Sequence, residues 1–134
     1  MNKFVFENFL VNGAFVSCER YGEGHINETY LLRLKDGDII TRYILQKINK
    51  SLFKEVDKLM NNIKIVTDFI REKVRKRGGD INREVLTIIY TKDGKPYYHD
   101  LEEDEYYRMY VFIERAIAYQ KEERPWQFWY YWSN

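Results

Sequence analysis

The feature that most constrains the fold is one long stretch of helical periodicity in the middle of the chain. Apolar residues recur there at steps of three and four, which places them on one face of a helix. These residues are Val56, Leu59, Met60, Ile63, Val66, Ile70 and Val74. Ser51 is a suitable N-cap, the basic residues of segment 73–77 suit the last turn, and Gly78 is a typical helix stop. The sequence therefore predicts one long helix with this apolar stripe in the core.

Patterns typical of β-strands lie on both sides of the helix. Before it, we predict strands at residues 15–21, 29–34 and 39–48, and a short helix over residues 2–11. After it, we predict strands at residues 84–90, 96–99 and 106–113. Asp-Gly turns at residues 35–38 and 92–95 favour tight hairpins. We therefore expect an α+β fold, an antiparallel five- to six-stranded sheet with one long helix packed on it.

Composition excludes several classes of protein. The 134 residues amount to one domain, and 45% hydrophobic residues argue against disorder. A net charge of +1 argues against a dedicated nucleic-acid or membrane-surface protein. Cys18 is the one cysteine and cannot form an internal disulfide, and two histidines argue against structural zinc. Because we find neither a signal peptide nor a span of ~18 apolar residues, we expect a cytoplasmic protein.

A glycine-containing segment, residues 22–27 (GEGHIN), lies between the first two predicted strands. Glycines allow the backbone to approach phosphates closely, and the exposed N–H groups supply donors. Two glycines also fit an ordinary hairpin connection. The order of strand, glycine loop, two strands and long helix is nevertheless that of a protein-kinase-like N-terminal lobe, where such a loop covers the nucleotide phosphates.

Longer strings strengthen this likeness, and over about residues 9–119 the chain resembles the aminoglycoside phosphotransferase and choline kinase superfamily. Within that superfamily it is most similar to the N-acetylhexosamine 1-kinase-like branch. The strings that carry the resemblance are 24–31 (GHINETYL), 43–49 (YILQKIN), 78–80 (GGD), 86–87 (LT), 91–98 (TKDGKPYY) and 107–114 (YRMYVFIE). The resemblance implies transfer of a phosphoryl group from ATP, with Mg²⁺, to a hydroxyl of a small, sugar-like molecule.

The resemblance also implies which residues meet the nucleotide. The phosphate loop would be lined by Gly22, Gly24, His25, Asn27 and Thr29. The hinge, whose backbone groups meet the adenine edge, would be Phe112, Ile113 and Glu114. The third strand should present a side chain to the phosphates, which in kinases is a Lys braced by a Glu on the long helix.

Two arrangements are open for that third strand. Either Gln46 or Lys47 faces inward, but not both, because strand side chains alternate. With Gln46 inward, Asn62 would occupy the place of the helix Glu, and the phosphates would be positioned by hydrogen bonds without an ion pair. With Lys47 inward, Glu55 or Asp57 is the expected partner.

The residues that perform kinase chemistry are missing from this sequence. Kinases use a catalytic Asp in a His-x-Asp-x-x-x-x-Asn loop and a second Asp that holds magnesium. His99 and Asp100 are adjacent and lack that spacing. We therefore expect residues 1–114 to form the nucleotide-binding lobe and residues 115–134 to form the hinge and the truncated start of a second lobe. The isolated chain should be inactive.

Six aromatic residues fall within residues 126–132, among them Trp126, Phe128, Trp129 and Trp132. A segment this apolar is expected to pack on a missing lobe, a partner or a second copy. One alternative is therefore a non-catalytic module that binds a nucleotide or dimerises. A second alternative is a nucleic-acid binder that uses residues 73–77, which the near-zero net charge disfavours.

Overall fold

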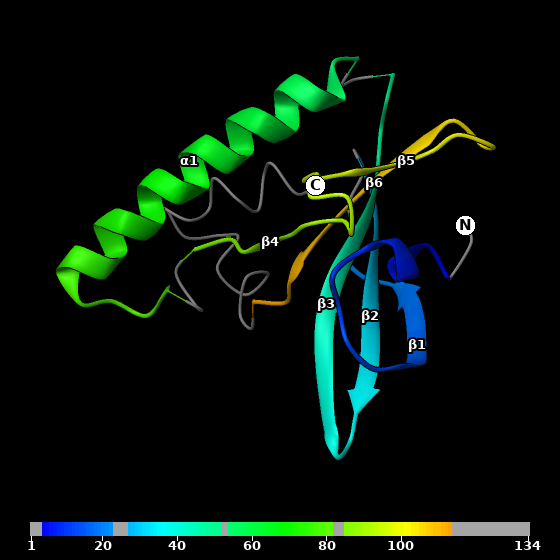
Figure 1. The fold of residues 1–134 in the computed structure, drawn as a ribbon, viewed down its shortest axis with the longest axis horizontal. Coiled ribbons are helices and arrows are strands. Elements are labelled where there is room, and N and C mark those ends of the chain that lie inside the picture. The colour runs from blue at the N-terminus through cyan, green and yellow to red at the C-terminus, as the bar shows by residue number, and fades with distance from the viewer. Residues whose placement is uncertain (1–3, 23–26, 52–53, 82–84, 114–134) are drawn as a thin grey trace.

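The computed structural model describes residues 4–22, 27–51, 54–81 and 85–113. They form one antiparallel sheet with a single α-helix along one side of it (Figure 1). In chain order the elements are the 3-10 helix η1 (Val5–Asn8), β1 (Ala14–Arg20), β2 (Glu28–Asp36), β3 (Ile39–Ile48), α1 (Val56–Arg77), β4 (Ile88–Ile89), β5 (Tyr98–Asp100) and β6 (Glu105–Val111). This confirms the predicted α+β class, with six strands among the described residues.

The long strands of the sheet are joined as the sequence predicts. β2 and β3 form a hairpin in which Asp36 pairs with Ile39, and Gly37 in the turn has a positive φ of 63°. The sheet order is β1-β2-β3-β6-β4, and β5 also pairs with β6. β6 therefore lies beside β3, although the whole of α1 separates them along the chain (Figure 1).

The second predicted hairpin is wrong, although its turn is present. The Thr91 N–H donates to the Lys95 carbonyl at 2.8 Å, which closes the turn. The strands on either side do not pair with each other, because each pairs with β6 instead. Ile88 lies opposite Tyr110, and Tyr98 lies opposite Tyr107. The Asp-Gly sequence makes the chain reverse direction at this turn. The backbone groups of β4 and β5, however, find their hydrogen-bond partners on the longer strand β6.

Other boundaries also differ from the prediction. Ser51 is not the N-cap of α1, since its hydroxyl donates to the Asn49 side chain and the helix begins only after Glu55. The C-terminal stop at Gly78 is confirmed, with φ 78° and an N–H donated to the Arg75 carbonyl. Val66, predicted in the core, is exposed. The predicted helix over residues 2–11 is only the four-residue η1, and residues 2 and 3 lie outside the described part.

Side chains alternate along each strand, so the sheet has two apolar faces. On the face toward α1, here called the helix side, the core consists of Leu31, Ile44, Ile48, Val56, Met60, Ile63, Leu86, Ile88 and Tyr110. On the opposite face, the outer side, the core consists of Val5, Phe6, Phe9, Leu32, Leu34, Leu45, Tyr107 and Met109. Neighbouring residues of β3 thus enter different cores.

Candidate functional site

The connection between β1 and β2 begins and ends at residues that the structure describes. Gly22 has a φ of 73°, a conformation that glycine adopts at little cost. Asn27 is buried, and its side-chain oxygen accepts the Asn49 N–H at 2.8 Å. This bond ties the exit of the loop to the end of β3. Gly24 and His25 lie outside the described residues.

A row of buried polar side chains crosses the helix side of the sheet from β2 through β3 to β6. Thr29 pairs with Gln46, and Gln46 pairs with Arg108, so the three residues are neighbours in register. The Gln46 Nε2 donates to the Thr29 hydroxyl at 2.8 Å, and the Arg108 Nε donates to the Gln46 Oε1 at 2.8 Å. The Tyr110 hydroxyl donates to the same Gln46 oxygen. We call Thr29, Gln46 and Arg108 the polar row.

In the structure, the two candidate residues on β3, Gln46 and Lys47, face opposite sides of the sheet. Gln46 is fully buried on the helix side, whereas Lys47 points to the outer side and lies 3.7 Å from the Glu105 carboxylate. The alternative with Lys47 inward is therefore wrong. Glu55, one of its expected partners, pairs instead with Lys58 at 3.1 Å, and Asp57 is exposed.

The expected pair of Gln46 and Asn62 is not formed either. Asn62 is exposed on α1, while Met60 is buried and its Sδ lies 3.9 Å from the Arg108 Nη1. Two helix positions are about 200° apart around the axis, so Met60 and Asn62 point in nearly opposite directions. Gln46 is braced by Arg108 from β6 rather than by a residue of α1.

The expected hinge is described at two of its three residues. The Phe112 N–H already donates to the Arg42 carbonyl at 3.2 Å, which continues the pairing of β6 with β3. The Phe112 ring lies 4.5 Å from the Arg42 guanidinium and 5.6 Å, edge to face, from the Tyr21 ring. Phe112, Ile113 and Tyr21 all pack against the helix-side core. Glu114 lies outside the described residues.

Two of these residues, Tyr21 and Arg108, were missed by the sequence analysis. Tyr21 stands directly before Gly22, so its position beside the glycine loop was the signal that could have found it. Arg108 offered no such signal, because its bond to Gln46 joins residues 62 positions apart.

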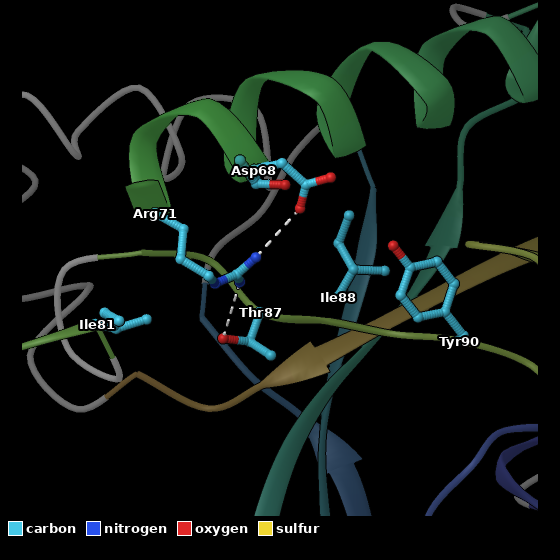
Figure 2. A pocket seen from close by; sticks show the side chains of 7 residues that line it. Asp68, Arg71, Ile81, Thr87, Ile88 and Tyr90 are labelled. Carbon is cyan, nitrogen blue, oxygen red and sulfur yellow. Dashed lines mark hydrogen bonds and ion pairs between the residues drawn. The ribbon is translucent and has the colours of Figure 1, made fainter. Parts of the chain in front are cut away.

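A separate cavity of about 320 Å³ lies between α1 and β4 (Figure 2). It is lined by Thr67, Asp68, Arg71, Ile81, Thr87, Ile88 and Tyr90. The Arg71 guanidinium reaches down from the helix and donates to the Leu86 carbonyl at 3.0 Å and to the Asp68 carboxylate at 3.3 Å. The bond to Leu86 connects α1 to the segment that leads into β4, whereas the bond to Asp68 lies within α1. The cavity shares no residue with the polar row.

The remaining candidate groups have structural explanations. Burial, and then the Glu19 carboxylate, raise the pKa of Cys18, so its thiol stays protonated at neutral pH and is a poor nucleophile. At the basic end of α1, Arg75 pairs with Glu72 at 2.9 Å, and the Lys73 ammonium lies 5.4 Å from the Phe69 ring. Two of the basic side chains at this end of α1 therefore already interact with neighbours on the helix.

No family model matches the chain. Among the described residues, no three His, Cys, Asp or Glu side chains gather where they could share a metal ion. No helix in the described ranges has both the length and the apolarity needed to cross a membrane.

Proposed function

We propose that this chain is the nucleotide-binding lobe of an ATP-dependent phosphotransferase that acts on a small, hydroxylated, sugar-like molecule. The observation that carries the proposal is the position of Gln46. It comes from the third strand, faces the side of the long helix, and is bonded to Thr29 just after the glycine loop. Kinases place a side chain of their phosphate site on the corresponding strand, ahead of their long helix.

The proposed roles follow from the contacts of each residue. The loop that starts at Gly22 would cover the phosphates with backbone N–H groups, while Asn27 holds the loop exit in place. Both ends of the Gln46 amide are already bonded, so Gln46 would position its neighbours in the row rather than touch phosphate. Since the Phe112 N–H is engaged, Ile113 is our candidate for the backbone contact to adenine.

Transfer itself needs groups that this sequence does not contain. No His-x-Asp-x-x-x-x-Asn segment is present to accept the proton of the attacking hydroxyl. We therefore expect the chain alone to bind ATP without passing its γ-phosphoryl group to a sugar. Phosphate transfer from labelled ATP to a sugar by the purified chain would contradict this expectation.

A non-catalytic module that dimerises is the second candidate, and exposed apolar side chains on α1 favour it. Ile65 and Phe69 are 65% and 63% exposed, four positions apart on the helix surface away from the sheet. Such a stripe, together with the aromatic segment 126–132, suits self-association. A mass by light scattering that rises with protein concentration, without any nucleotide binding, would favour this candidate.

Calorimetric titration of the full chain with Mg-ATP tests the proposed nucleotide-binding function. Two glycines allow a test variant and a matched control variant. Gly22 and Gly94 have similar positive φ values of 73° and 80°. Alanine at either position carries a similar backbone strain of about 1–2 kcal/mol. We expect Gly22→Ala to weaken ATP binding by up to about tenfold and Gly94→Ala to leave it unchanged. Equal effects, or no binding by the wild-type chain, would refute the proposal.

A further inference from the structure

The cavity between α1 and β4 combines apolar walls with a few polar groups, which is the usual composition of a site for a small molecule (Figure 2). Its volume of about 320 Å³ lies at the lower end of the range for such sites. Ile88 of β4 and the ring of Tyr90 line it on one side, and Ile81 lines it from the segment after α1. Arg71 reaches into this space from α1 (Figure 2).

The contacts of Arg71 fix its orientation but do not use all of its hydrogen-bond donors. The Nη1 group donates to the Asp68 carboxylate at 3.3 Å. The Nη2 group donates to the Leu86 carbonyl at 3.0 Å and to the Thr87 hydroxyl at 3.4 Å. These bonds leave two of the five N–H groups of the guanidinium without an acceptor among the described residues. Since 24% of the side chain is exposed, a ligand in the cavity can reach it.

Two hydroxyl groups add further donors to the same cavity. The Thr87 hydroxyl accepts a bond from Arg71 and keeps its own hydrogen to donate. The Tyr90 hydroxyl is directed toward α1, and it has no hydrogen-bond partner within the described part of the chain (Figure 2). The cavity therefore offers N–H and O–H donors above an apolar wall, which suits a ligand with acceptor oxygens on an apolar body.

The charges around the cavity favour an anion. The Asp68 carboxylate lies 3.5 Å from the Lys64 ammonium and 3.3 Å from the Arg71 guanidinium, so two cations surround one carboxylate. The single excess positive charge suits a monoanion. We propose that this cavity binds a small organic monocarboxylate, whose oxygens accept bonds from Arg71 and whose apolar body packs on Ile88 and the Tyr90 ring. This site is separate from the proposed nucleotide site, since it shares no residue with the polar row.

The test is an NMR titration of the full chain with its isoleucine methyl groups isotopically labelled. Benzoate is the probe, because it joins a carboxylate to an apolar ring, and benzamide is an uncharged counterpart of nearly the same shape. Benzoate should shift the Ile81 and Ile88 signals to a plateau and leave the signal of Ile40, exposed on the β2–β3 hairpin, unchanged. Benzamide should bind about tenfold more weakly, since it lacks the charge-assisted bond.

A pair of arginine variants tests the proposed role of Arg71. Arg71→Met removes the guanidinium, so benzoate affinity should fall about tenfold or more. Arg75→Met is the matched control, because Arg75 lies about one turn further along α1, pairs with Glu72 at 2.9 Å and does not line the cavity. It should bind benzoate as the wild type does. An Arg71→Met chain with wild-type affinity, or an Arg75→Met chain that loses it, overturns the assignment.

A second variant keeps the test valid where Arg71→Met does not fold. The Asp68 side chain is 54% exposed, so Asp68→Asn should be accommodated while it removes the negative charge that competes for Arg71. Benzoate affinity should therefore rise by about two- to fivefold. An unchanged or lower affinity would contradict the proposed site.

Three results with the wild-type chain would also overturn the proposal. Equal binding of benzoate and benzamide would show that the cavity does not select an anion. Inorganic phosphate that shifts the Ile81 and Ile88 signals as strongly as benzoate would show that the apolar body contributes nothing. Signals that move with none of these ligands would show that the cavity is not a site for this class of molecule.

Discussion

Replacing Tyr107 with phenylalanine should stabilise the protein, although the change only removes an oxygen atom. Tyr107 is fully buried on the outer side of the sheet, and its hydroxyl has no hydrogen-bond partner among the described residues. A buried polar group without a partner costs about 1–3 kcal/mol. Tyr107→Phe keeps the ring in place and removes this penalty, so the free energy of unfolding should rise by about 1 kcal/mol or more.

Tyr110→Phe is the matched control, three residues along the same strand but on the helix side. The Tyr110 hydroxyl donates to the Gln46 side chain, so its removal should lower the free energy of unfolding by about 1 kcal/mol. Urea unfolding followed by far-UV circular dichroism measures both variants, with shifts in midpoint at an unchanged slope. A Tyr107→Phe midpoint at or below that of the wild type would refute the reasoning.

An alkaline titration gives an independent measurement of the same group. Burial, and then the Glu103 and Glu105 carboxylates, raise the pKa of Tyr107 from 10.0 to about 12. The unfolded chain loses this proton first, so this group leaves the free energy of unfolding constant below pH 10 and lowers it as the pH rises from 10 to about 12. The loss corresponds to about 3 kcal/mol. It should be absent from Tyr107→Phe, and the difference between the two curves isolates it from other tyrosines.

Two further predictions concern a glycine that lies against the backbone of β2 and a surface carboxylate. Gly13 has a φ of 123°, and an added Cβ would lie 2.9 Å from the Lys35 carbonyl oxygen. Gly13→Ala should therefore destabilise the fold by about 1–3 kcal/mol, measured by urea unfolding, and an unchanged midpoint would contradict the close contact. Hydrogen bonds from His99 and Lys50 lower the pKa of Asp104 below 3.8, so its contribution to stability is present above that pH and is lost as the pH falls through the lowered value. Asparagine tolerates the φ of 53° at this position, so Asp104→Asn should keep the local backbone. In this variant the free energy of unfolding should fall less steeply at acid pH than in the wild type, and an unchanged slope would contradict the assignment.

Sequence patterns within a few residues were sufficient to predict some boundaries of helices and strands. The bounds of β3, residues 39–48, follow from a run of β-favouring residues after an Asp-Gly turn. The end of α1 at Gly78 follows from the need for a left-handed residue after the last turn. In both cases the signal for the boundary lies in residues that are close in sequence, so the sequence by itself determined where these elements start or stop.

The tertiary structure alone decided which side chains meet at the candidate site. Periodicity shows that Gln46 and Lys47 point in opposite directions, but only the packing of α1 on one face of the sheet decides which of them is enclosed. The burial of Arg108 beside Gln46 depends on β6 pairing with β3 across 62 residues of chain. The choice of β6 over β4 as the partner of β5 is of the same kind. Such contacts depend on strand register and on the face that the helix covers, and neither is encoded within a short window of sequence.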